Sequence, residues 1–262
     1  MNTVVIASTE ADASAASAVE QHHAQMAGAL ALKVQTVLNS VVGGVDADVR
    51  TSAEQLVAWC ENELIPHATA EEATLYAAAR RRPEGKLLVD GMLAEHTVIL
   101  DLVREIADAT SPLSAATAAR ALQVVFDSHL EKENSLVLPL LVAAPDISVA
   151  DLLGGLHELV GGASTHEDPE DAHGGHACAC GESDGDQYPE LDARAIPHAI
   201  RHATIFGALA AIRPGGGMVL VAPHDPKPLL AQVEQRNPGV FAVEYLEQGP
   251  QDWRLAFVRQ PV

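Results

Sequence analysis

The chain is poor in cysteine and in basic residues, and each shortage excludes a class of protein. Its three cysteines, Cys60, Cys178 and Cys180, are an odd set with a C-x-C too close for an ordinary disulfide framework, so a reducing, cytoplasmic location fits best. Only 16 Lys and Arg side chains stand against 36 Asp and Glu, which gives a formal charge of −20. Such a charge argues against binding to nucleic acid or to an anionic membrane surface.

The sequence also lacks a long uninterrupted apolar run. The longest, "LVLPLLVAA", contains Pro139 and is shorter than the roughly 18 to 20 residues that a membrane span needs. The N-terminal stretch "MNTVVIASTEADASAASAVEQ" has no basic region followed by an apolar core, so no secretory signal is expected. Because 48% of the residues are apolar, we expect a globular, soluble protein with no membrane partner.

Residues 14–160 have the periodicity of helices almost throughout. Short breaks containing Gly, Pro and Ser divide this part into long helical segments and a short fifth one near "SVADLLGGLHELV". Connections this short make neighbouring helices antiparallel, so the pattern predicts an up-and-down four-helix bundle. The long helices are expected at residues 14–40, 46–82, 83–109 and 111–144.

Local signals predict where these helices begin, end and bend. Ser14 or Ser17 is expected to cap the first helix, which should end at Gly43 and Gly44. Ser111 followed by proline predicts the start of the fourth helix. Pro66 lacks an amide hydrogen and should loosen the second helix.

The composition changes after residue 160 and again near residue 189, which predicts a multidomain chain. Residues 161–188 include "GGASTHEDPEDAHGGHACACGESDGDQ", with seven acidic side chains and no Lys or Arg, so we interpret them as a flexible linker. Its histidines and cysteines leave metal capture open as an alternative. Residues 189–262 predict a small two-layer α/β domain of β-α-β-α-β-β order with its helices on one face of the sheet. The linker residues in question are His166, His173, His176, Cys178 and Cys180.

Two histidines in the helical part are each followed, four positions later, by a glutamate. These are His67 and Glu71 in "HATAE", and His129 and Glu133 in "HLEKE". Residues four apart share one helix face, and an exposed pair of this kind stabilises a helix by roughly 0.2 to 0.5 kcal/mol. The neighbours on both faces are apolar, Phe126 among them, so these pairs are expected in the core.

The first and third helices each add one histidine of the same character. His96 lies in an apolar stripe, and His23 precedes Met26 by three positions, with the adjacent His22 as the alternative. Either one alone is consistent with a hydrogen-bonded core histidine. Tyr76, nine residues after His67, is expected to pack in the core, with an approach to the site as the alternative.

Burying six polar side chains together requires a common partner, because each unpartnered group costs several kcal/mol. Imidazole and carboxylate suit iron, manganese or zinc, and two carboxylates can bridge a pair of ions. Glu and His side chains on the helices of a bundle are an established way to hold two irons. The alternative is a metal-free bundle in which the six groups hydrogen-bond to one another.

The order His, "HATAE", His, "HLEKE" over the first 150 residues resembles the hemerythrin-like family, in its bacterial branch named for a His-His-Glu pattern. The resemblance implies a non-haem di-iron centre. Carried over residue by residue, it implies terminal ligands at His23, His67, His96 and His129, and bridging ligands at Glu71 and Glu133.

Oxygen-carrying members of that family have a further histidine on the third helix, and here its position is Leu100. Fewer histidines imply open coordination positions and a more reactive centre. We therefore expect a protein that binds dioxygen or nitric oxide for sensing or a stress response, with an unknown redox or protein partner. The alternatives are a di-iron enzyme (oxidase, peroxidase or nitric oxide reductase) and an iron donor for iron-sulfur repair.

The last 75 residues or so resemble an uncharacterised small α/β family related in fold to sulfur-carrier proteins. The likeness lies in "LDARAIPHAIRHATIFGAL" and "VAPHDPKPL". Sulfur carriers have a cysteine before the first helix, and this domain has none, which argues against sulfur transfer. Asp225 followed by proline predicts the cap of the second helix. An anion or metal pocket is the alternative for His198, Arg201, His202, His224, Asp225 and Lys227.

Overall fold

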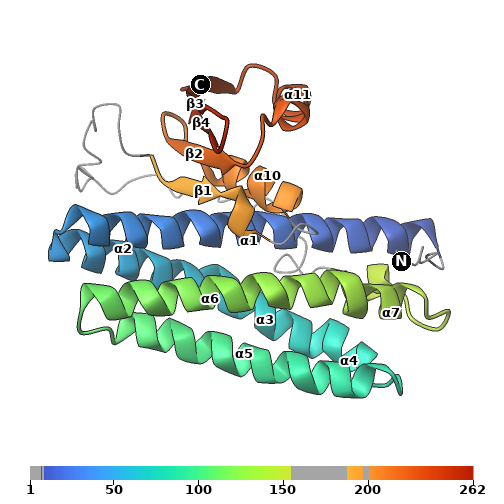
Figure 1. The fold of residues 1–262 in the computed structure, drawn as a ribbon. Coiled ribbons are helices and arrows are strands. Elements are labelled where there is room, and N and C mark those ends of the chain that lie inside the picture. The colour runs from blue at the N-terminus through green and yellow to red at the C-terminus, as the bar shows by residue number, and fades with distance from the viewer. Residues whose placement is uncertain (1–6, 8, 155–187, 197–200, 262) are drawn as a thin grey trace, which may run out of the picture.

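The computed structural model describes residue 7 and residues 9–154, 188–196 and 201–261. These ranges form a helical N-terminal region and a small α/β unit with a four-stranded mixed sheet (Figure 1). The predicted linker falls almost wholly outside them, as do His198 and the linker histidines and cysteines. The proposed domain limits of 14–160, 161–188 and 189–262 therefore remain predictions.

The first helix, α1 (Glu10–Gly43), begins earlier than predicted. Its N-cap is Thr9, whose side chain accepts a 3.1 Å hydrogen bond from the backbone N–H of Asp12, so the prediction of Ser14 or Ser17 was wrong. The helix extends back because Thr9 and the acidic first turn satisfy its free amide groups. The predicted end is confirmed: Gly44 takes the left-handed conformation, with φ of 74°.

The second helical rod runs from Asp46 to Ala79 and contains wider π-helical turns. The turn η1 (Cys60–Leu64) ends two residues before Pro66. Because proline has no N–H to donate to the carbonyl four residues back, the predicted loosening of the helix appears as this change of turn. The rod consists of α2 (Asp46–Trp59), η1 (Cys60–Leu64), α3 (Ile65–Glu71), η2 (Glu72–Tyr76) and α4 (Ala77–Ala79).

The third and fourth rods follow the same rules. The predicted cap at Ser111 is confirmed. The Ser111 side chain accepts a hydrogen bond from the backbone N–H of Ser114, and the Ser114 side chain accepts one from the backbone N–H of Ser111. A further π-helical turn, η3, begins at Glu133 and ends two residues before Pro139. The third rod is α5 (Gly85–Ala107). The fourth rod consists of α6 (Pro112–Lys132), η3 (Glu133–Val137) and α7 (Leu138–Val142), and the short helix α8 (Val149–Leu152) follows it.

The rods lie side by side, with α1 packed on α2 and α6, and α5 on α6 (Figure 1). By length and composition alone α1 would pass as a membrane span. Its residues Val19, Leu30 and Val34 are fully buried within the protein. A core helix of a bundle explains these features without a membrane.

The α/β unit has strand order β1-β2-β4-β3, with β1 parallel to β2 and the other pairs antiparallel. Met218 and Leu220 of β2 share one core cluster with residues of both helices, so α10 and α11 pack on the same face of the sheet. Its elements are β1 (Glu190–Asp192), the 3-10 turn η4 (Ala193–Ala195), α10 (Arg201–Ala211), β2 (Gly217–Ala222), α11 (Lys227–Arg236), β3 (Phe241–Gln248) and β4 (Trp253–Arg259).

The predicted cap at Asp225 was wrong. The residue before α11 is Pro226, and it makes no side-chain cap bond. Asp225 instead accepts a 3.0 Å hydrogen bond from the Tyr245 hydroxyl and pairs with Lys227 at 3.2 Å. The Asp225 carboxylate, which was expected to cap the helix, therefore binds the Tyr245 phenol of β3 instead.

Candidate metal site

The six side chains singled out from the sequence converge inside the bundle, and each residue is at most 3% exposed. They come from all four rods, which explains why no short stretch of sequence contains the site. Helix α1 supplies His23, α3 supplies His67 and Glu71, α5 supplies His96, α6 supplies His129, and η3 begins with Glu133.

The six residues form two overlapping groups of four. Within each group, one nitrogen or oxygen atom from every residue lies within 4.8 Å of the others. Both groups contain Glu71 and Glu133, and they differ only in their histidines. One group adds His23 and His67, and the other adds His96 and His129.

Each carboxylate directs its two oxygens toward different histidines. Glu71 Oε1 lies 3.3 Å from His23 Nε2 and 3.1 Å from His67 Nε2, while its Oε2 lies 3.7 Å from His96 Nε2. Glu133 Oε2 lies 3.8 Å from His23 Nε2, and its Oε1 lies 3.4 Å from His129 Nε2. Each carboxylate therefore lies against histidines of both groups.

The separations fit shared coordination better than direct hydrogen bonding. With metal–nitrogen bonds of about 2.1 Å, neighbouring donors are separated by about 3.0 Å around an octahedral ion and about 3.4 Å around a tetrahedral ion. The distances given above fall near these values and are long for charge-assisted hydrogen bonds. Among the described residues, His23 Nε2, Glu71 Oε1 and Glu133 Oε2 are buried without a hydrogen-bond partner. These atoms fit a metal ion as their common partner.

Three of the histidines each contact, through Nδ1, a polar side chain that is not one of the six. His23 Nδ1 lies 2.7 Å from Asn134 Oδ1, His96 Nδ1 lies 2.7 Å from Glu72 Oε1, and His129 Nδ1 lies 3.0 Å from Glu95 Oε2. An Nδ1–H that donates to these oxygens leaves the Nε2 lone pair facing the centre, as metal-binding histidines require.

Sequence reasoning missed these supporting residues, although a signal was present. Glu72, Glu95 and Asn134 each adjoin one of the six in the sequence. One residue further along a helix turns the side chain by about 100°, which directs it to the neighbouring helix rather than to the centre. Lys132 in turn donates to Glu95.

Tyr76 packs in the core as expected, and it also reaches the site, as the alternative had it. Its hydroxyl donates to Glu133 and lies 3.2 Å from His129 Nε2, and its ring stacks on His96 at 5.3 Å. The π-helical turn η2 ends at Tyr76 and changes the direction of the side chains that follow Glu71. Burial and the nearby charges of Glu133 and Glu71 raise the pKa of Tyr76, so the phenol is neutral and donates a hydrogen bond.

The electrostatics of the site attract positive charge. Burial alone would raise the pKa of Glu71, but His67 and His23 outweigh it and hold the pKa well below the ordinary value. Burial likewise lowers the pKa of His129, while Glu133 and Glu71 raise it by more. An ionised Glu71 in the core therefore requires neighbouring protons or cations.

The adjacent His22 lies at the margin of the site. It is half-buried, its ring centroid lies 5.1 Å from that of His67, and it is absent from both groups of four described above. A cavity of about 340 Å³ begins at His22 and extends between α1, the second rod and α10.

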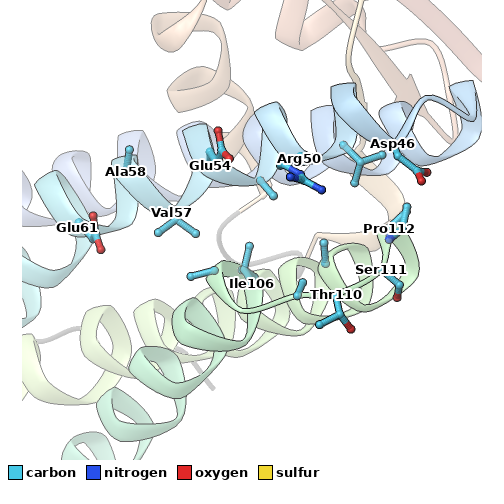
Figure 2. A pocket seen from close by; sticks show the side chains of 15 residues that line it. Asp46, Arg50, Glu54, Val57, Ala58, Glu61, Ile106, Thr110, Ser111 and Pro112 are labelled. Atoms are coloured by element: carbon cyan, nitrogen blue, oxygen red, sulfur yellow. The ribbon is translucent and has the colours of Figure 1, made fainter.

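The larger cavity, of about 580 Å³, is elsewhere. It lies between α2 and the corner that joins α5 to α6, and Figure 2 shows Arg50 and Glu54 on one side with Ile106 and Thr110 on the other. None of the six converging residues lines it.

Among the described residues of the C-terminal unit, the predicted polar side chains do not form a comparable cluster. His202 and His224 are exposed, and Arg201 donates to the carbonyl of Ile196. Within the described part of this predicted set, the pair Lys227–Asp225 is the one ion pair.

Comparison with known protein families gives two matches along the chain. Residues 14–141 match the hemerythrin HHE cation binding domain, and residues 190–259 match a family described as an uncharacterized conserved protein (DUF2249). The comparisons with curated proteins and with solved structures returned no match. The first family and the two buried groups agree on cation binding.

Proposed function

Because residues 14–141 belong to the hemerythrin HHE cation-binding family, we propose that this bundle holds a non-haem di-iron centre that binds dioxygen or nitric oxide for sensing or a stress response. The C-terminal α/β unit would serve as the output or partner module. The same donors accept manganese and zinc, and iron is favoured by the mixed set of imidazoles and carboxylates. A redox or protein partner and a cytoplasmic location remain part of the proposal.

One observation carries the two-ion proposal: Glu71 and Glu133 are shared between the two groups of buried ligands. A single ion would leave one pair of histidines without a role and would not need two carboxylates with divided oxygens. Two bridged ions use all six side chains and satisfy the buried atoms that lack hydrogen bonds.

The number of protein donors supports binding of a small exogenous molecule. Two histidines and two carboxylate oxygens give each ion four protein donors. Iron accepts five or six ligands, so positions remain for a gas or for water. The residue four positions after His96 is Leu100, which has no donor atom to fill them. When bound, two ferrous ions supply electrons for dioxygen and positions for nitric oxide.

The surrounding side chains orient the site and connect it to solvent. The Glu72 side chain is 45% exposed and lies 2.7 Å from His96 Nδ1, so it links a buried imidazole to water. Glu95, which is 29% exposed, does the same for His129. Both carboxylates can accept a hydrogen bond from the Nδ1–H of their histidine and so orient the imidazole.

Metal analysis combined with spectroscopy tests this proposal. Protein from iron-replete cells should contain about two irons per chain, and its absorption spectrum should change on exposure of the ferrous form to dioxygen or nitric oxide. A reversible change without sustained turnover supports sensing. Well under one metal per chain would support the metal-free bundle instead.

A di-iron enzyme is the second candidate, and Tyr76 is the observation that favours it. A phenol that donates to Glu133 and stacks on His96 is placed to pass a proton at the centre. Steady multiple turnover with a reductant and dioxygen, peroxide or nitric oxide would select this candidate. Transfer of iron to an apo-acceptor would select the iron donor.

A further inference from the structure

Two glycines bring the α/β unit into backbone contact with the helix that carries His23. A Cβ atom placed on Gly207 of α10 would lie 2.0 Å from the carbonyl oxygen of Ala24. A Cβ atom on Gly28 of α1 would lie 2.0 Å from the backbone nitrogen of Ala208. No Cβ atom fits at either position without a shift, so the backbones of α1 and α10 touch where the helices cross.

Helix α1 therefore belongs to two cores at once. On one face Met26 and Leu30 are part of the bundle core. On another, Ala31 is buried in the core of the α/β unit with Ala208 and Leu209 (Figure 1 shows α10 against α1). The contact of Gly207 falls on Ala24, the residue next to His23, so a movement of α10 acts directly on the helical turn that holds this histidine.

The site depends on α1 through one residue only. His23 is the sole member of the six on α1, while the other five lie on the second, third and fourth rods. A cavity of about 340 Å³ lies beside the crossing, between α1, the second rod and α10, and Gly207 lines that cavity. The backbone contact with α10 supports α1 from the side that faces away from the bundle core.

We propose that Gly28 and Gly207 are positioning residues for the candidate metal centre. The α/β unit holds α1 so that His23 reaches Glu71 and Glu133, and a looser contact weakens the ion of the His23 group while it spares the ion of the His96 group. The C-terminal unit would thereby help to form the metal centre. This inference rests on the proposed two-ion function.

Single alanine substitutions in the full-length protein test the proposal. Gly207→Ala and Gly28→Ala force the helices apart, and Gly91→Ala on α5 is the matched control because nothing lies within 4 Å of its added Cβ atom. Each of the three substitutions replaces glycine by alanine within a helix, so the gain in helix propensity is the same and cancels when the variants are compared. Ferrous iron is titrated anaerobically into each protein, with circular dichroism to confirm folding.

The control should bind about two ions, and both test variants should bind one tightly and the other about 10-fold to 100-fold more weakly, as when the support of a ligand is removed. Adding His23→Ala to Gly207→Ala should remove the weakened ion and leave the tight one, since both changes act on the same ion. Adding His96→Ala should remove the remaining ion. Retention of both ions, or equal weakening of both, would overturn the proposal.

A metal-free measurement separates this inference from the proposed function. If the natural protein binds no iron, the di-iron function fails. Hydrogen exchange at residues 20–31 of the metal-free protein then decides the positioning role. Faster exchange in Gly207→Ala and Gly28→Ala than in Gly91→Ala supports it, and equal exchange contradicts it.

Discussion

The Nε2 atoms of His96 and His129 lie 3.0 Å apart, while their Nδ1 atoms lie against Glu72 and Glu95. If both Nδ1 atoms carry their protons toward these carboxylates, the two Nε2 atoms present lone pairs to each other. Such a pair is repulsive unless a proton or a cation lies between the nitrogens. Two ligands bound at a right angle to one ion at about 2.1 Å would have the observed separation, which favours the cation.

The adjacent histidines of α1 provide a matched pair of variants. His23→Gln should lose one of two bound ions, because His23 belongs to only one group of four. His22→Gln should keep both ions, since His22 lies outside both groups. Elemental analysis after gel filtration measures the difference. Loss of an ion in His22→Gln alone would reverse the assignment of the α1 ligand.

The shared carboxylates should behave differently from any single histidine. Glu71→Gln or Glu133→Gln is expected to weaken both ions, because each carboxylate contributes to both groups, and by more than the roughly 10-fold to 100-fold cost of losing an outer partner. Iron should then raise the melting temperature of the natural protein by mass action but not that of these variants. Glu61→Gln, an exposed change on the same rod, is the control. An unchanged stoichiometry in Glu71→Gln would argue against bridging.

Removal of the Tyr76 hydroxyl should alter the centre without emptying it. Tyr76→Phe leaves all six donors in place but removes the hydrogen bond to Glu133. In the metal-free protein this should lower the free energy of unfolding by about 1 to 3 kcal/mol, since a buried acceptor loses its donor. In the loaded protein the absorption spectrum or the rate of oxidation should change at constant iron content. Loss of an ion would mean that the phenol is itself a ligand.

Asp12 should make the attachment of α1 dependent on pH. Hydrogen bonds from Thr9, from the backbone N–H of Ala150 and from Ser148 lower the pKa of Asp12. A depressed folded-state pKa adds stability above the unfolded pKa of about 4, and this stability is lost as the pH falls through the folded value. Asp12→Asn should therefore be less stable than the natural protein at pH 7, with the difference shrinking below about pH 4. Urea unfolding at both pH values measures it, and a difference independent of pH would contradict it.

Much of the bundle was predictable because its signals are local. The stop at Gly44 and the cap at Ser111 depend on backbone groups within a few residues, and both are confirmed. The start of α1 was predicted too late because Thr9 and Ser14 offer the same chemistry. The choice between them depends on Asp12, whose carboxylate is held by residues about 140 positions away.

The sequence by itself determined that His67 shares a helix face with Glu71, and His129 with Glu133, because the helical repeat places residues four apart on one side. It also determined that these faces are apolar enough to be buried. Only the tertiary structure decided that the two carboxylates fall between both pairs of histidines, that Tyr76 reaches Glu133, and that α10 rests on α1 at Gly28. Those relationships depend on how the helices are rotated and spaced, and packing between distant segments sets rotation and spacing.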